Sequence, residues 1–467
     1  MPCARPALLL TALVALGCSE ANDAPTAGAD PPPEPTSILL LTFDTLRRDH
    51  LGVYGYALDT SPEIDAFAAA ATRFDDAYAT APWTLPTHAS LLTGLHPFEH
   101  GARTLDPKPA LSAQKGLNAA PLDLVRVTLA ETLRDEGFRT GAFVANPLFL
   151  GVKFQLNQGF DVYEVEKTSA AEINVRALAW LDEQRRLAPD APFFLFLNYL
   201  DTHRPYRSQP SNPRLPAASD EDPGQLLKDL TAAVMEEDDA DPSALRERLI
   251  AHYDQAIANA DAAFGQLLDA LRARGLFDDT LIAITSDHGE FFGEHDLVEH
   301  SKDVYQPVIR APLIVKAARQ TAGSVDARTV TSVDVPRLIL DATPSLEGRH
   351  DAQYSYAVGE HPSVVENYYS RAKDLRRSYG YRFDRIRTVL LFGNHKYIHS
   401  SDGQHELYDL VADPGETVNL QTVQPERSRL AREQLEVFQA GRRVDATAVA
   451  VDVSDEEATL LEDLGYL

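Results

Sequence analysis

Unbroken apolar runs recur along the chain, and each one ends near a polar residue. The first run, SILLLTF, covers 37–43, and similar runs cover 140–146, 193–200, 280–286 and 312–317. Apolar stretches without alternation are typical of strands that are buried on both faces of a parallel sheet. The pattern therefore predicts at least five core strands between residues 37 and 317.

Helical spacing separates these runs. The clearest case is 243–274, where apolar residues recur every three or four positions from Leu245 to Leu271 and Gly275 follows as a stop signal. Alternating strand and helix patterns predict an α/β catalytic domain over 37–345, with a doubly wound, mostly parallel sheet and helices on both faces.

The pattern changes after about residue 345. Short strand-like runs with a turn at Ser401–Gly403, followed by a terminal helix over 424–440, predict a smaller C-terminal α+β subdomain over 346–467. The segment 207–243 is rich in Pro, Asp and Glu. It is interpreted either as a lid over the site or as a mobile surface insertion.

The N-terminus has the layout of an export signal. Arg5 precedes a short apolar run that ends at Cys18, so 1–18 is predicted to be a lipoprotein-type signal peptide, with an ordinary cleaved signal as the alternative. Residues 19–36 follow as a flexible linker. We expect an exported bacterial lipoprotein, periplasmic or on the cell surface, that contacts the membrane only through its lipid anchor.

Composition narrows the chemistry. The only other cysteine is Cys3, which leaves with the signal, so the mature chain is expected to hold no disulfide, thiol nucleophile or cysteine metal ligand. The formal net charge of -27 argues against a nucleic-acid partner, because phosphate backbones are bound by clustered Lys and Arg.

Polar residues follow three of the predicted strands. Asp44 follows the first, Asp201 and His203 follow 193–200, and Asp287 and His288 follow 280–286. Ligands of open parallel sheets bind beyond the carboxyl ends of the strands. One Asp at such an end is commonly a helix cap, but three ends together indicate a site for one divalent metal ion, with Ca, Mg, Mn and Zn all left open.

A second candidate element is the predicted helix PTHASLLTGLH, which reaches Gly94 and has Thr84 at or near its N-cap. In one interpretation Thr84 only caps the helix. In the other, the helix N-terminus and a nearby metal activate Thr84 as a nucleophile and favour an anionic ester.

Several segments together resemble the alkaline phosphatase and sulfatase superfamily: LLLTFDTLRRDHLGVYG, LPTHASLLTG, FLFLNYLDTHRPY, TSDHGEFFGEHDLVEH and ELYDLVADPGETVNL. The resemblance covers nearly the whole mature chain. It implies Asp44, Asp287 and His288 as metal ligands. It implies Thr84 as the nucleophile, which also touches the metal.

Further residues are implied by the same resemblance. His203 and His300, with His88, are expected to orient the transferring oxygens or to protonate the leaving group. Asn146 and Lys302 are candidate substrate-binding residues, together with His203. Thr45, which adjoins Asp44, and His295 are additional candidates.

The chain also departs from the sulfatase pattern. Sulfatases carry Cys-x-Pro-x-Arg, whose cysteine or serine becomes formylglycine, whereas this chain has Thr-x-Pro-x-His over 84–88. Threonine cannot form that aldehyde, and the motif resembles that of nucleotide pyrophosphatase/phosphodiesterases. The spacing of Asp201 and His203 does not match the Asp-x-x-x-His of two-zinc relatives, which favours one metal.

The leading hypothesis is a hydrolase of phosphate mono- or diesters, or else of sulfate esters, on a small-molecule, glycan or lipid substrate. Three alternatives stay open: a sulfuric ester hydrolase proper, a periplasmic phosphoryl or headgroup transferase, and a non-catalytic lipoprotein that binds anions or glycans.

Overall fold

The computed structural model describes residues 37–104, 116–117, 119–206, 211–235, 241–346, 358–359, 361–369, 383, 385–444, 451–452, 454 and 459. The predicted signal peptide and linker, over 1–36, lie outside these residues. So do 207–210 and 236–240 of the predicted insertion.

The central sheet has eight strands in the order β11-β2-β10-β7-β1-β6-β4-β5. At its centre, β1 (Ser37–Phe43) pairs in parallel with β6 (Phe193–Tyr199) on one side and β7 (Thr280–Ser286) on the other. Beyond β6, β4 (Arg139–Val144) and β5 (Val162–Val165) continue the parallel arrangement. The continuous apolar runs therefore form the buried middle of the sheet, as the sequence predicts.

The other edge contains one reversal. β10 (Leu313–Lys316) is antiparallel to both β7 and β2 (Thr72–Tyr78), and β11 (Ser324–Thr331) is parallel to β2. The chain between β7 and β10 stays near the carboxyl end of β7 and makes no helical crossover, so β10 has to run back alongside it. The sheet is mostly parallel as predicted, although the run at 312–317 is antiparallel.

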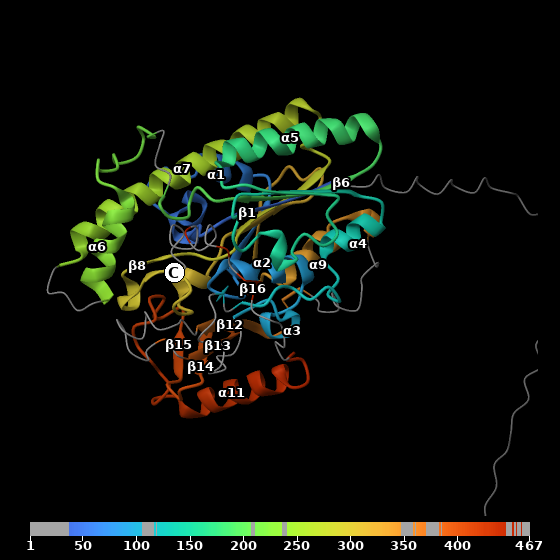
Figure 1. Cartoon of the computed structure of the whole chain (residues 1–467). Coiled ribbons are helices and arrows are strands. Elements are labelled where there is room, and N and C mark those ends of the chain that lie inside the picture. The colour runs from blue at the N-terminus through green and yellow to red at the C-terminus, as the bar shows by residue number, and fades with distance from the viewer. Residues whose placement is uncertain are drawn as a thin grey trace, which may run out of the picture. The chain divides into compact units, whose positions relative to one another are not determined.

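Helices cover both faces of this sheet (Figure 1). On one face, α5 (Ala170–Leu187) and α1 (Pro62–Ala68) pack against the long α7 (Ser243–Ala273). The end of α7 agrees with the prediction, because Gly275 adopts φ +66, a left-handed conformation that suits glycine. None of the helices among the described residues is both long and apolar enough to cross a bilayer.

On the other face lie α2 (Thr84–Thr93), α4 (Leu129–Asp135) and α9 (Asp334–Asp341). Shorter elements occupy the connections: α3 (Pro97–His100), α8 (Gln306–Ile309), the pair β8 (Phe291–Phe292) and β9 (Val298–Glu299), the pair β3 (Gly116–Leu117) and β16 (Val451–Asp452), and the single turns η1 (Arg48–His50), η2 (Gly52–Tyr54), η3 (Val152–Phe154), η4 (Glu294–Asp296) and η5 (Pro344–Leu346).

The predicted insertion contains regular structure. α6 (Pro223–Met235) packs against α7 and buries Leu226, Leu227, Leu230 and Met235. Apolar residues at helical spacing within the acidic segment account for this helix. The described part of 207–243 therefore includes a packed helix, and its role as a lid or as a mobile insertion stays a prediction.

A second, antiparallel sheet follows the central one. It comprises β12 (Ser363–Tyr369), β13 (Arg385–Phe392), β14 (His395–Ser400) and β15 (Glu406–Asp409), and α11 (Pro425–Gln439) packs against it. The sequence predicts the last three strands, the turn and the helix, but it does not reveal β12.

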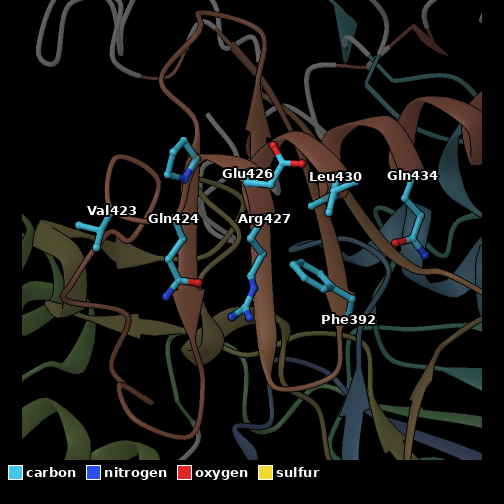
Figure 2. Close-up of a pocket in the computed structure, with 9 residues that line it drawn as sticks. Phe392, Val423, Gln424, Glu426, Arg427, Leu430 and Gln434 are labelled. Carbon is cyan, nitrogen blue, oxygen red and sulfur yellow. The ribbon is translucent and has the colours of Figure 1, made fainter.

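A groove of about 580 Å³ lies between the first turns of α11 and Phe392 of β13 (Figure 2). Val423, Arg427 and Leu430 are among the residues that line it. Its lining contains none of the residues that the sequence predicts for the site.

Candidate active site

Three of the predicted metal ligands lie together at the carboxyl end of the central strands. Phe43 of β1 pairs in register with Ser286 of β7, so the next residues, Asp44 and Asp287, emerge side by side. The ligand atoms of Asp44, Asp287 and His288 all lie within 4.8 Å of one another, and all three side chains are buried. Strand register alone brings these distant residues to one point.

The donor atoms of this cluster fit a divalent cation. Asp287 Oδ1 accepts hydrogen bonds from the amides of Thr45 at 3.1 Å and His288 at 2.9 Å, whereas Asp287 Oδ2 is buried without a hydrogen-bond partner. Asp44 Oδ1 is likewise buried and without such a partner. Two buried carboxylates that each present an unsatisfied oxygen beside an imidazole form a donor set that Zn, Mn, Mg or Ca can use.

Burial is the largest cause of the pKa shifts within the cluster. Burial, followed by repulsion from Asp287, raises the pKa of Asp44 well above its ordinary value. Burial likewise raises the pKa of Asp287 to about 7 and lowers that of His288. A bound cation would stabilise both ionised carboxylates and the neutral imidazole.

Thr84 is directed toward the same cluster. It is the first residue of α2, where Trp83 is the N-cap and no side chain caps the helix. Thr84 Oγ1 lies 3.4 Å from His288 Nε2, and the nearby Thr84 hydroxyl is one of the groups that lower the pKa of the Asp287 carboxyl against the larger effect of burial. The interpretation of Thr84 as a simple cap therefore has no support in this geometry.

Asn146 and Thr45 form hydrogen bonds that support the cluster of Asp44, Asp287 and His288. Asn146 Nδ2 donates to Asp44 Oδ2 at 3.0 Å, and its Oδ1 accepts from the amides of Leu148 and Phe149. The Thr45 hydroxyl donates to the Thr202 carbonyl at 2.8 Å. These contacts orient Asp44 and its loop, and a contact between Asn146 and substrate stays a prediction.

His88 lies one helical turn after Thr84. Its Nδ1 is 2.9 Å from the Thr84 carbonyl and its Nε2 is 3.1 Å from Thr42 Oγ1. Burial lowers the pKa of His88 to about 3, so the ring is neutral at physiological pH. Both nitrogens contact protein groups that hold the first turn of α2, and a direct catalytic role stays a prediction.

His203 and His300 lie edge to face beside the metal cluster. Their ring centroids are 5.3 Å apart, and the His300 ring is 4.6 Å from that of His288. His203 Nδ1 is bonded to the Arg204 carbonyl at 2.9 Å, and His300 Nδ1 is bonded to Glu290 Oε1 at 3.0 Å. The structure therefore brings both predicted histidines to the cluster.

Lys302 belongs to an ion triad next to these histidines. Its ammonium is 2.9 Å from Glu299 Oε2, and Arg204 lies 2.8 Å from Glu299 Oε1. Burial alone would raise the pKa of Glu299, but the two cations lower it to about 2. The triad joins the loop of His203 to the loop of His300, and a contact between Lys302 and substrate stays a prediction.

Two other candidates lie elsewhere. His295 stacks on Tyr305, with ring centroids 3.7 Å apart. The Asp201 carboxylate accepts a hydrogen bond from the Ala170 amide at 2.8 Å, at the start of α5. Asp201 thus takes the capping role that is common at strand ends and is not part of the described metal cluster.

Three charged residues around His300 were not predicted from the sequence and are buried or nearly buried: Glu290, Glu299 and Arg204. Glu290 stands three residues after Asp287 and two after His288, which is the only signal in the sequence that points to it. Charge in an irregular segment normally indicates solvent exposure, so their burial could not be read from the pattern.

A family model described as Sulfatase matches residues 36–345, and the chain belongs to this family of hydrolases, within the alkaline phosphatase-like superfamily. The Ulvan-active sulfatase of Formosa agariphila is 26% identical over 378 residues, covering 74% of this chain and 67% of that protein. Human arylsulfatase A is 24% identical over 461 residues, covering 83% of each chain.

Solved structures share the fold. A phosphonate monoester hydrolase of Agrobacterium radiobacter superposes with a TM-score of 0.63 at 20% identity, covering 87% of this chain and 96% of that one. A protein in complex with its substrate D-glucosamine-2-N,6-O-disulfate gives a TM-score of 0.66 at 19% identity, covering 87% and 98%.

Proposed function

We propose that this chain is an exported, metal-dependent hydrolase that cleaves phosphate esters, and less readily sulfate esters, with Thr84 as its nucleophile. The observation that carries the proposal is the placement of the Thr84 hydroxyl at the N-terminus of α2, 3.4 Å from His288 Nε2. Export is inferred from the signal-like pattern ending at Cys18.

Each residue of the site would have a separate role in ester hydrolysis. Asp44, Asp287 and His288 would hold one divalent cation, which when bound supplies a Lewis acid for an ester oxygen and lowers the pKa of a nearby hydroxyl. Thr84 Oγ1 attacks the central atom of the ester. The positive end of the α2 dipole favours the negative charge of the ester oxygens. His203 and His300, whose rings lie beside that of His288, would orient the ester oxygens or protonate the leaving group.

The identity of the nucleophile favours phosphorus over sulfur. A threonine hydroxyl cannot form the aldehyde hydrate of sulfatases, which releases sulfate by elimination. A phosphothreonine can be cleared by water, whereas a sulfothreonine lacks that elimination route. Sulfate esters are the second candidate substrates, because two of the relatives are named sulfatases.

The test is turnover of four chromogenic esters by the purified chain, stripped of metal and then supplied with Zn, Mn, Mg or Ca singly. The esters are p-nitrophenyl phosphate, bis-p-nitrophenyl phosphate, p-nitrophenyl phenylphosphonate and p-nitrophenyl sulfate. We expect metal-dependent hydrolysis of the phosphorus esters that falls at least about 10³-fold in Thr84→Ala.

Thr84→Ser is the matched control, because it keeps the hydroxyl and removes one methyl group. It should retain measurable hydrolysis of the same ester. A Thr84→Ala protein with a near wild-type rate would exclude Thr84 as the nucleophile, and a preference for p-nitrophenyl sulfate would overturn the argument from phosphorus chemistry.

A further inference from the structure

His300 stands between two residues with an unusual backbone conformation. Glu299 and Ser301 both have φ +66, a left-handed conformation that residues other than glycine rarely adopt. Such strain persists only where the surrounding structure holds it, and it is concentrated at functional sites. The contacts that hold Ser301 therefore bear on the position of the histidine beside it.

Ser301 is held by hydrogen bonds on both sides of its backbone. Its amide donates to the Pro82 carbonyl at 2.9 Å. Its carbonyl accepts from Asn367 Nδ2 of β12 at 3.2 Å. Pro82 stands two residues before Thr84. One strained residue is therefore bonded to the segment of the proposed nucleophile and is also the chain neighbour of His300.

The Asn367 side chain is used in an unusual way for a buried amide. Asn367 is 2% exposed, and its Oδ1 has no hydrogen-bond partner among the described residues. Burial of an amide with an unsatisfied oxygen is unfavourable, so such a residue contributes little to stability by itself. Its Nδ2, in contrast, is directed to the Ser301 carbonyl. This pattern indicates a side chain that positions Ser301.

The strand that carries Asn367 is bonded along both edges. On one edge β12 pairs with β13, where Asn367 lies opposite Arg387. On the other edge the Glu366 amide donates to the Thr80 carbonyl at 2.9 Å, in the segment that leads into α2. Arg387 also contacts Asp303 at 2.8 Å, in the segment that Asn367 holds. The amide of Asn367 therefore projects from a fixed strand.

We propose that Asn367 is a positioning residue, which holds Ser301 in its left-handed conformation. Ser301 in turn keeps His300 and the segment before Thr84 at a fixed separation. The inference rests on the proposed function, because this separation affects the rate only if Thr84 attacks an ester that His300 contacts. It gives the small sheet a part in catalysis that acts through the backbone of Ser301.

The test measures kcat and KM of the metal-loaded full chain on p-nitrophenyl phosphate and bis-p-nitrophenyl phosphate. Asn367→Ala is made in the wild-type chain and in Ser301→Gly, because glycine adopts a left-handed conformation without strain. Asn419→Ala is the matched control. The Asn419 side chain accepts from the Leu407 amide at 3.0 Å, in the same C-terminal subdomain.

Asn367→Ala should lower kcat about tenfold and leave KM nearly unchanged, because the ester still binds while the reacting groups are displaced. In Ser301→Gly the same substitution should lower kcat no more than about twofold, since no strained backbone has to be held. Asn419→Ala should lower the thermal unfolding midpoint and leave kcat unchanged. Equal losses from Asn367→Ala in the two backgrounds, or a similar loss in Asn419→Ala, would overturn the positioning role.

Hydrogen exchange gives a readout that does not depend on turnover. The Ser301 amide should exchange at least about tenfold faster in Asn367→Ala and at the wild-type rate in Asn419→Ala. Unchanged exchange in Asn367→Ala would contradict the inference even in an active enzyme. A wild-type chain that hydrolyses no ester would instead count against the proposed function, whatever the exchange rates. If Asn367→Ala does not fold, Asn367→Leu, which is closer to Asn in volume, replaces it in every comparison.

Discussion

In each of the two acidic residues of the candidate metal cluster, the two carboxylate oxygens differ in their hydrogen bonding. In Asp287, Oδ1 receives two backbone amides and Oδ2 is left without a hydrogen bond. In Asp44, Oδ2 receives the Asn146 amide and Oδ1 is left without a hydrogen bond. One oxygen is anchored and the other is available, which is how outer contacts orient metal ligands.

Replacing Asp287 with Asn should therefore abolish stoichiometric metal binding and lower ester hydrolysis at least about 10²-fold, because the cation loses a charged ligand. Metal content by inductively coupled plasma spectrometry checks the expectation. Asp201→Asn is the matched control at the end of β6, where the carboxylate caps α5. Asp201→Asn should lower the free energy of unfolding by about 0.5–2 kcal/mol and leave the metal content unchanged.

The ion triad of Glu299, Arg204 and Lys302 predicts a pH-dependent stability. The pKa of Glu299 is lowered to about 2 from an ordinary value of 4.5, so its contribution is present above about pH 4.5 and is lost as pH falls toward 2. Lys302→Met should reduce the free energy of unfolding by about 1–2 kcal/mol at pH 7, since Arg204 keeps part of the interaction. The difference from wild type should shrink below pH 4.5.

Urea titrations between pH 3 and 8 measure that difference. A constant difference across the range would show that Lys302 stabilises the fold through packing and not through the charge of Glu299.

At the scale of elements, the loop after β7 depends on close backbone approach. A Cβ on Gly289 would meet the Pro307 carbonyl at 2.1 Å, whereas Gly275, at φ +66, has no atom within 4 Å of its Cβ position. Gly289 is required because a side chain there would clash with a neighbouring carbonyl. Gly275 is required only because its backbone is left-handed.

Gly289→Ala should therefore displace the loop that carries His288 and Glu290 and lower kcat at least about tenfold. Gly275→Ala should cost about 1 kcal/mol of stability through its left-handed backbone and leave kcat unchanged. Rates on 2,4-dinitrophenyl phosphate and thermal unfolding separate the two effects. Equal activity in both variants would mean that the loop accommodates a methyl group.

The elements that the sequence predicts best are those with the strongest local signal. β1 and β7 have the predicted bounds, and α7 ends within a residue of its prediction, because long apolar runs and a glycine stop report burial directly. β2, β5 and β11 were not predicted, since their mixed polar sequences reflect lower burial at the sheet margin.

In the candidate site, too, the residues that could be predicted are those with a strong local signal. Asp44, Asp287 and His288 could be inferred because they stand immediately after buried strands, where topology brings side chains together. Asp201 stands at a similar place, yet its carboxylate turns to the α5 amide. The partner of a strand-end carboxylate depends on a rotamer and a neighbouring helix, which are tertiary features that a local pattern does not contain.

At the scale of the whole chain, buried ion pairs join the small sheet to the segment that follows the candidate site. Lys396 of β14 pairs with Glu416, and both side chains are fully buried. Lys396 also donates to the Val304 carbonyl, and Glu416 Oε2 accepts from the Gln306 amide at 2.6 Å. Arg387 of β13 adds a 2.8 Å contact to Asp303.

Lys396→Met should lower the unfolding free energy by about 3–5 kcal/mol, because Glu416 is left as a buried charge without its counter-ion. The double variant Lys396→Met/Glu416→Gln should recover most of that loss, since it removes the stranded charge. Urea unfolding measures both variants. If the double variant is as unstable as the single one, packing of the lysine stem and not charge burial is the cause.

The register between β1 and β7 also has a consequence for biosynthesis. The Thr45 amide and the Asp287 carboxylate are hydrogen-bonded although they are 242 positions apart in the chain. A ribosome makes the first half of the cluster long before the second, so a nascent chain that ends before residue 288 carries Thr84 and Asp44 without their partners. Truncated translation products should therefore be inert, and the candidate centre is assembled only when β7 docks beside β1.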